Sequence, residues 1–207
     1  MRTGASTAGL RFVFSLRRLP PRVALFMFRA RRHAVRAGDE FTLASAIRPA
    51  DLAALVRLAR GRRTVTELGT GTAVSAIALV LADARRTVVT CDPCVRPERE
   101  AYLALAGRSA RARIELRAQR DSEGPRRGDC AELLFIDSEH YRESVLTAFR
   151  AWRGCLEAGA VVAFHDYDHP SYPGVREAVA ELGLAGRSVG GMFVASIEPP
   201  EAGAARL

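Results

Sequence analysis

The fold is specified by one short stretch of the sequence, Val65-Thr66-Glu67-Leu68-Gly69-Thr70-Gly71-Thr72-Ala73-Val74-Ser75. A β-branched run leads into two glycines one residue apart, and an apolar helical pattern begins at Ala73. This order predicts a strand, a tight turn and a helix. The glycines let the backbone turn and approach a ligand, while the first N–H groups of the helix point into the same space. The stretch therefore predicts the first βα unit of a nucleotide-binding sheet.

Acidic residues before and after this turn indicate which class of nucleotide-binding protein the sheet belongs to. A dinucleotide-binding turn would place a small residue where Val74 stands, and it does not need Glu67. A second β-branched strand ends at Asp92, where a carboxylate can accept both hydroxyls of a ribose. The pattern E-x-G-x-G, followed by an acid after the second strand, resembles the class I S-adenosylmethionine (SAM) dependent methyltransferases. The resemblance implies SAM as cofactor, with these contact residues: Glu67, Gly69, Thr70, Gly71, Ser75, Asp92, Asp121 and Ser122.

The rest of the chain alternates between strand and helix patterns. We expect strands at 64–68, 87–91, 112–117, 131–136 and 160–165, and helices at 73–82, 97–106, 141–156 and 174–182. A further helix should follow Pro49 and stop at Gly61, and a hairpin of 187–189 and 192–197 should close the chain. The pattern predicts an α/β, Rossmann-like seven-stranded sheet, mostly parallel, with a C-terminal antiparallel hairpin strand, helices on both faces and ligands at the carboxyl ends of the strands.

Composition is that of a globular protein with an appendage. The chain has 207 residues, 48% hydrophobic and 26% charged, which suits one domain of ordinary size. No apolar run approaches the roughly 20 residues that cross a bilayer. We therefore expect a soluble protein, with the methyltransferase domain at 39–207 and a separate N-terminal arm at 1–38. The four cysteines resemble reduced, mostly buried residues, which is compatible with a cytoplasmic protein.

The formal charge of +8 belongs to that arm. All 31 basic residues are Arg, and nine of them precede Asp39, the first acid. The remaining sequence is close to neutral. Three interpretations of the arm stay open: a lid or dimer contact that could make a homo-oligomer, a patch for a membrane surface or nucleic acid, and plain disorder.

Chemistry-bearing residues follow two neighbouring strands. The strand at 131–136 is followed by Asp137 and His140, and the next strand leads into His165 and Asp166. Because the carboxyl ends of parallel strands meet at one edge, the two aspartates should share a cleft. Converging carboxylates suit Mg²⁺, and a His there can take a proton at neutral pH. The sequence thus predicts Asp137 and His140 as catalytic residues.

Two motifs make the resemblance more specific: Ile136-Asp137-Ser138-Glu139-His140-Tyr141, and Phe164-His165-Asp166-Tyr167 followed by Pro173-Gly174-Val175-Arg176. They resemble the small-molecule O-methyltransferases of antibiotic and sugar pathways and, more distantly, the metal-dependent catechol O-methyltransferases. The catechol-type enzymes imply Asp137, His165 and Asp166 as Mg²⁺ ligands. Those enzymes have an acid and then an amide where this chain has His165 and then Asp166, and a Lys base where it has His140.

The function that follows is a SAM-dependent O-methyltransferase acting on a hydroxyl of a small molecule, assisted by Mg²⁺, with His140 as candidate base. One alternative is an RNA or nucleic-acid methyltransferase that uses the basic arm, although the chain lacks an N/D-P-P-Y/F motif after the strand at 131–136. Another is a non-catalytic SAM-binding module or a nicotinamide oxidoreductase, which Glu67, Val74 and the two acidic strand ends disfavour.

Overall fold

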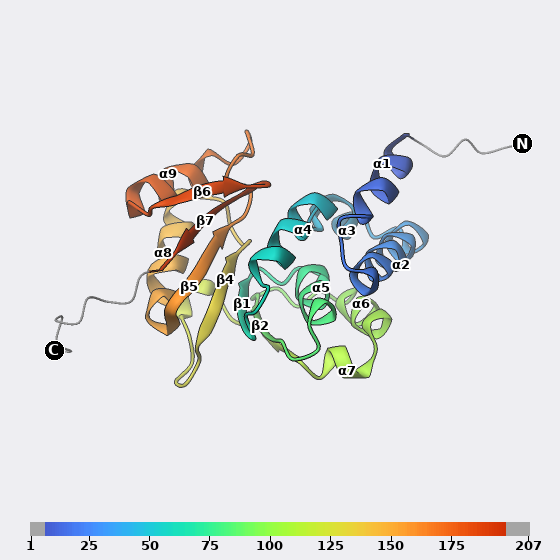
Figure 1. Cartoon of the computed structure of the whole chain (residues 1–207), viewed down its shortest axis with the longest axis horizontal. Helices are drawn as coiled ribbons and strands as arrows, with labels where there is room; N and C mark the ends of the chain where they lie inside the picture. Colours follow the sequence, from blue (N-terminus) through green and yellow to red (C-terminus); the bar gives the residue numbers. More distant parts are fainter. Residues whose placement is uncertain (1–6, 198–207) are drawn as a thin grey trace, which may run out of the picture.

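A mixed sheet forms the centre of the computed structural model, which describes residues 7–197, with side chains from residue 12 onward (Figure 1). Its strand order is β3-β2-β1-β4-β5-β7-β6. The first five strands are parallel, and β7 pairs antiparallel with both β5 and β6. This confirms the predicted sheet and its C-terminal hairpin. The strands are β1 Thr64–Leu68, β2 Thr87–Cys91, β3 Ile114–Arg117, β4 Ala131–Ile136, β5 Leu156–Phe164, β6 Gly186–Val189 and β7 Met192–Ser196.

Helices cover both faces of the sheet. In Figure 1, α8 and α9 lie on one side and α4, α5 and α6 on the other, with α2 outside α5 and α6. No helix among residues 7–197 is long and apolar enough to cross a membrane. The helices are α1 Thr7–Leu16, α2 Pro21–Ala37, α3 Glu40–Ser45, α4 Pro49–Leu58, α5 Val74–Ala82, α6 Arg99–Ala106, α7 Arg108–Arg111, α8 Arg142–Trp152 and α9 Pro173–Leu182.

Strand β4 shows why a central strand carries a run of apolar residues. Its Leu133 and Phe135 pack into the core beneath α4 and α5, whereas Leu134 and Ile136 pack into the core beneath α8 and α9. Successive side chains of a strand point to opposite faces, so a strand covered on both sides needs an unbroken apolar run. The two cores, one on each face of the sheet, therefore hold the strands whose ends form the site.

Several bounds differ from the sequence prediction by one to four residues. Helix α8 ends at Trp152 instead of 156, and β5 begins at Leu156. Strand β5 starts early because Leu156 already pairs with Ala131, ahead of an irregular stretch of the ladder. The short helix α3 was not predicted; Asp39 caps it by accepting a hydrogen bond of 2.9 Å from the N–H of Thr42.

Helix α2, the second helix of the N-terminal arm, packs on helices α5 and α6 of the sheet. Pro21 opens α2 and Gly38 ends it in the left-handed conformation. One face of α2 is buried against α5 and α6, and the Tyr102 hydroxyl of α6 donates a 2.6 Å hydrogen bond to Asp39. The division of the chain at residue 38, and a role of the arm as a lid, stay predictions.

The buried face of α2 leads to a stability prediction. Phe26 is 3% exposed, so Phe26→Ala should leave a cavity and lower the free energy of unfolding by about 3–5 kcal/mol. Phe28 lies on the same helix and is 44% exposed; Phe28→Ala should cost less than about 1 kcal/mol. Urea unfolding of both variants measures the difference. Equal, small losses would mean that α2 does not stabilise the domain.

Candidate active site

The turn after β1 passes directly against the end of β4. Gly69 has a φ of +99°, and a Cβ atom there would lie 2.1 Å from the carbonyl oxygen of Asp137. The Gly69 N–H donates to the Cys91 carbonyl at 2.9 Å, and the Asp137 N–H donates to the Leu68 carbonyl at 2.8 Å. Only glycine fits this position, for space as well as for backbone conformation. The turn and the first acidic strand end are thus held together.

Asp92 at the end of β2 binds and orients the same turn. One carboxylate oxygen accepts the Gly71 N–H at 2.9 Å, and the other accepts the Cys94 N–H at 2.8 Å. The Arg99 guanidinium lies 3.7 Å from the carboxylate. Each carboxylate oxygen can accept a further hydrogen bond, so the fixed side chain can still bind a ligand's hydroxyl groups.

Glu67 lies beneath the turn. Its side chain is fully buried and accepts a 2.6 Å hydrogen bond from the Thr90 hydroxyl, which also lies 2.8 Å from the Thr70 hydroxyl. The second carboxylate oxygen has no hydrogen-bond partner among the described residues. Burial raises the pKa of Glu67 to about 7. Glu67 does not line the cleft, because it is buried beneath the glycine turn. That it contacts the cofactor stays a prediction.

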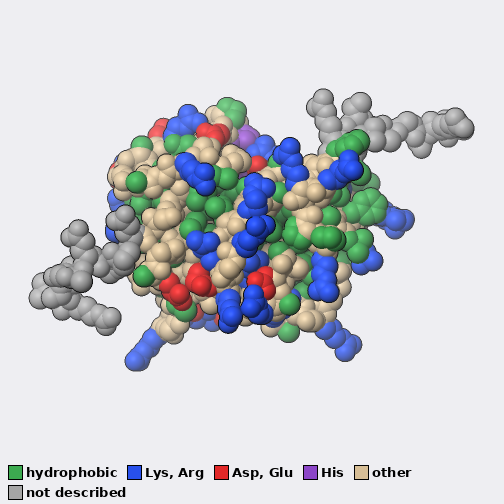
Figure 2. Space-filling model, viewed as in Figure 1, with side chains coloured by type: hydrophobic (Ala, Val, Ile, Leu, Met, Phe, Trp, Pro, Cys, Tyr) green, Lys and Arg blue, Asp and Glu red, His purple; other side chains and the backbone are tan. Residues whose placement is uncertain are grey.

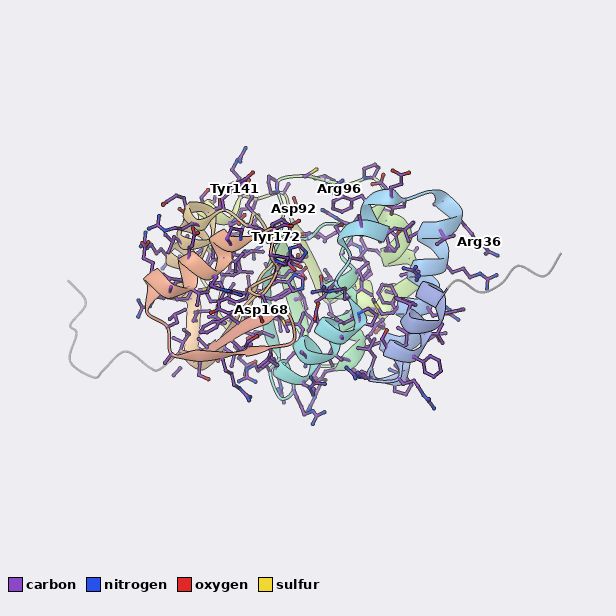
Figure 3. All side chains as sticks on the ribbon, turned by 90° about the horizontal axis from the view of Figure 1, so that it is seen from above. Arg36, Asp92, Arg96, Tyr141, Asp168 and Tyr172 are labelled. Atoms are coloured by element: carbon purple, nitrogen blue, oxygen red, sulfur yellow. The ribbon has the colours of Figure 1, made fainter. Side chains whose placement is uncertain are left out.

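A cleft of about 940 Å³ opens at this edge of the sheet. Figure 3 shows Asp92, Arg96 and Tyr172, which all line it, gathered over the middle of the molecule. Phe41 of α3 is the first residue in chain order that lines the cleft, so none of residues 12–40 borders it. The cleft brings together every site residue predicted from the sequence except Glu67: Gly69, Thr70, Gly71, Ser75, Asp92, Asp121, Ser122, Asp137, His140, His165 and Asp166.

Asp121 and Ser122 stand on a short turn after β3 that is tied to the rest of the site. The Ser138 hydroxyl donates a hydrogen bond to the Asp121 carboxylate, and the Trp152 indole donates to the Asp121 carbonyl at 2.8 Å. These bonds hold the loops after β3 and β4 against each other. Asp121, Ser122 and Ser138 all line the cleft.

Three side chains in the cleft form a group that could hold a metal ion: Asp137, His140 and Asp166, whose ligand atoms all lie within 4.8 Å of one another. The His140 Nε2 lies 3.1 Å from an Asp166 oxygen but makes no hydrogen bond among the described residues. The His140 ring stacks on Tyr172, with centroids 4.1 Å apart. Asp166 itself has a φ of +53°, a conformation that few residues other than Gly, Asn and Asp adopt.

His165 lies behind this group. Its Nδ1 is 2.8 Å from an Asp137 oxygen and 3.4 Å from an Asp166 oxygen, and its Nε2 is 3.7 Å from Asp51. Burial would lower the pKa of His165, but Asp137 and the two other carboxylates raise it to about 12. By distance between ligand atoms the group consists of Asp137, His140 and Asp166, and the predicted ligand role of His165 stays a prediction.

Sequence reasoning missed Asp51 of α4. The side chain is 5% exposed, accepts the Arg48 Nε–H at 2.8 Å and the Gly191 N–H at 3.2 Å, and faces His165. The only signal in the sequence was an acid beside the apolar run Leu52 to Leu55, which reads equally well as an ordinary first-turn acid.

A second missed feature is the wall formed by Phe41 and Arg96. The Arg96 guanidinium lies over the Phe41 ring, 3.3 Å from its centroid, and the Phe41 ring comes within 3.5 Å of where a Gly71 side chain would begin. Both residues line the cleft. No sequence pattern links the two residues, because they come from α3 and from the loop after β2.

Comparison with known proteins agrees with the fold. A family model described as a methyltransferase domain matches residues 66–167, whereas a search of curated proteins gives no match. Among solved structures, a candidate caffeoyl-CoA O-methyltransferase from Staphylococcus aureus has a TM-score of 0.63 and 13% identity, covering 81% of this chain and 91% of its own. The O-methyltransferase TomG from Streptomyces achromogenes, involved in tomaymycin synthesis and solved with SAM, has a TM-score of 0.58 and 22% identity, covering 81% and 89%. An O-methyltransferase from Bacillus cereus, solved with S-adenosylhomocysteine, has a TM-score of 0.61 and 16% identity, covering 80% and 87%.

The strand order, the glycine turn and the acidic strand ends are those expected of the class I SAM-dependent methyltransferase fold, and a methyltransferase-domain model matches residues 66–167. In fold, the chain is similar to these three solved O-methyltransferases.

The geometry around Asp92 predicts a binding defect. Asp92→Ala removes the acceptors for the Gly71 and Cys94 N–H groups and those expected for the ribose. Hydrogen bonds to a charged group contribute about 1.5–3 kcal/mol, so S-adenosylhomocysteine should bind about 10- to 100-fold more weakly by calorimetry. Asp83 follows the C-terminus of α5, away from the glycine turn at its N-terminus, so Asp83→Ala should bind S-adenosylhomocysteine normally. Binding of NADH in place of S-adenosylhomocysteine would contradict the assignment.

Proposed function

We propose that this protein transfers the methyl group of SAM to a hydroxyl of a small molecule, assisted by a divalent cation. The observation that carries the proposal is the convergence of Asp137, His140 and Asp166 in the cleft, next to the glycine turn. The similarity to O-methyltransferases supports the reaction class. The acceptor would occupy the part of the cleft beside this group, with Tyr172 as one of the residues that border it.

The donor set fits a metal ion. Two carboxylates and an imidazole supply ligand atoms, and the buried His140 Nε2 lacks a hydrogen-bond partner among the described residues. Its distance of 3.1 Å from Asp166 is close to the spacing of about 3 Å between neighbouring ligands of an octahedral ion with bonds of about 2.1 Å. We propose Mg²⁺, held by Asp137 and Asp166; a third, imidazole ligand would favour Mn²⁺ more than Mg²⁺. Such an ion would lower the pKa of the acceptor hydroxyl and fix its direction.

The first half of the sheet would hold the cofactor. We propose that Asp92 accepts the ribose hydroxyls, that the turn at Gly69 and Gly71 allows close approach of the methionine part, and that Asp121 and Ser122 border the adenine. In the transfer, an oxygen–carbon bond forms as the sulfur–carbon bond breaks, so the sulfonium becomes a thioether and the hydroxyl loses its proton. Rate depends on keeping oxygen, methyl and sulfur in line.

His140 is our candidate for the proton acceptor, at Nε2. Its ring is held by Tyr172 on one side, and the Nε2 atom points to the same space as the carboxylates. His165 and Asp51 would act as positioning residues, since the hydrogen bond from His165 Nδ1 fixes one oxygen of Asp137. This leaves the other Asp137 oxygen available for the ion.

A screen of hydroxylated metabolites with methyl-labelled SAM tests the function. The expected result is label transfer to an oxygen of one acceptor class, lost on adding EDTA and restored by Mg²⁺ or Mn²⁺. Transfer of label to RNA instead of a small molecule would overturn the acceptor class. Tight SAM binding with no transfer to any acceptor would favour a non-catalytic module.

His140→Ala separates the two roles that its position allows. If His140 is the general base, turnover should fall by about 10²- to 10⁴-fold, with unchanged binding of S-adenosylhomocysteine, and should partly recover as pH rises and hydroxide takes the proton. His169→Ala, which removes a nearby imidazole outside the ligand group, should lower turnover far less. Recovery at high Mn²⁺ instead of at high pH would show that His140 is a ligand and not the base.

A further inference from the structure

The outer face of α2 combines arginines with exposed apolar side chains. Opposite the buried stripe of this helix lie seven residues at helical spacing on a single face: Arg22, Leu25, Phe28, Arg29, Arg32, Val35 and Arg36. Leu25, Phe28 and Val35 are 49%, 44% and 60% exposed. No acid occurs before Asp39 in the sequence. We call these seven residues the outer α2 face.

Helix α1, which packs on α2, adds side chains of the same two kinds. Phe14 is 62% and Val13 is 50% exposed, and Arg17 and Arg18 are exposed beside them. Figure 2 shows green and blue atoms mixed over the end of the molecule that α1 and α2 form, with no red atoms visible there. In Figure 3, Arg36 extends outward from α2, away from the cleft. The surface is therefore both cationic and apolar over two helices.

We propose that the outer α2 face, with the exposed part of α1, binds the surface of a membrane that contains anionic lipids. Arginine attracts the anionic headgroups, and its long stem can lie along the boundary while Phe and Leu enter the acyl region. Helix α2 is already folded and anchored by its buried face, so binding would not have to order it. The proposal is independent of the acceptor and of the metal.

The apolar members of the face argue against the other partners of a basic surface. Nucleic acid is bound through phosphates and stacked bases, and exposed Leu25 and Val35 contribute to neither. A second copy of the chain meeting this face through a two-fold axis would set arginine against arginine with no acid between them. An anionic bilayer satisfies both the charge and the apolar side chains.

Vesicle cosedimentation of the full chain tests the proposal. The protein should pellet with vesicles of phosphatidylcholine and phosphatidylglycerol at 7:3 and not with phosphatidylcholine alone. The triple substitution R29Q/R32Q/R36Q should weaken binding by roughly 100-fold, since each arginine near an anionic surface contributes about a factor of five. The matched control R108Q/R127Q/R153Q, three exposed arginines elsewhere on the protein, should bind like the unchanged chain.

The apolar contribution needs its own comparison. Leu25→Ser with Phe28→Ser should reduce vesicle binding at least tenfold, whereas Val95→Ser, which is 67% exposed on the loop after β2, should not. Circular dichroism confirms that each variant is folded. The proposal is overturned if anionic vesicles do not bind, if both triple variants lose binding equally, or if the serine pair binds as tightly as the unchanged chain. It is also overturned if the protein is a dimer in solution that R29Q/R32Q/R36Q converts to a monomer.

Discussion

Asp137→Asn should lower turnover by at least about 10³-fold while leaving the affinity for S-adenosylhomocysteine nearly unchanged. The substitution keeps the size of the side chain but removes the charge that the proposed ion needs and weakens the bond with His165, which is 2.8 Å long. Cofactor binding should survive because it rests mainly on Asp92 and the glycine turn. Label transfer from SAM and calorimetry measure the two quantities separately.

Chelation should reproduce the loss that Asp137→Asn causes, and Glu177→Gln, an exposed acid on α9, should change neither quantity. Full activity in excess EDTA, together with near-normal turnover of Asp137→Asn, would refute the metal proposal. The two aspartates would then be hydrogen-bonding groups, and catalysis would depend on alignment with His140.

Gly69→Ala should destabilise the whole domain and abolish cofactor binding. The new Cβ would lie 2.1 Å from the Asp137 carbonyl oxygen, which is backbone and cannot swing away, at a φ of +99°. Strain and overlap together should lower the free energy of unfolding by more than about 3 kcal/mol. Thermal or urea unfolding and S-adenosylhomocysteine binding provide the measurements.

The chain offers a matched glycine for comparison. Gly61 also has a positive φ, +81°, but a Cβ there would meet nothing within 4 Å. Gly61→Ala should therefore cost only the conformational strain, about 1–2 kcal/mol, with normal cofactor binding. If Gly69→Ala unfolded at the same midpoint as Gly61→Ala, the close approach of the β1 turn to Asp137 would not be a rigid constraint.

Local patterns predicted the features that local physics determines. The bounds of β1, β2 and β4 were predicted from their β-branched and apolar runs, which suit strands covered by helices on both faces. Asp92 and Asp137 could be assigned to one edge because parallel strands end there together. The short α3 and the early start of β5 depend on a cap and on an irregular pairing with β4, which leave little trace in a sequence.

Contacts between distant segments could not be predicted. The environment of His165 is set by Asp51 from α4 and by Asp137 from the end of β4, and no motif joins these positions. The same holds for Phe41 and Arg96, which meet only because α3 folds over the loop after β2. For the arm, the excess of arginine was visible in the sequence, but its division into a buried and an exposed face of α2 required the packing on α5 and α6.

The contact between Gly69 and the main chain of Asp137 has a consequence for how such an enzyme can change acceptor. The proposed function places the cofactor on one side of this contact and the ion on the other, so we expect the sheet, without a closing motion, to set the distance across which the methyl group moves. A new acceptor would then require new walls, on α3 and on the loop at 167–173, but no readjustment of the line from sulfur to oxygen. In this arrangement, substitutions in the walls of the cleft could change acceptor specificity without changing the reaction geometry.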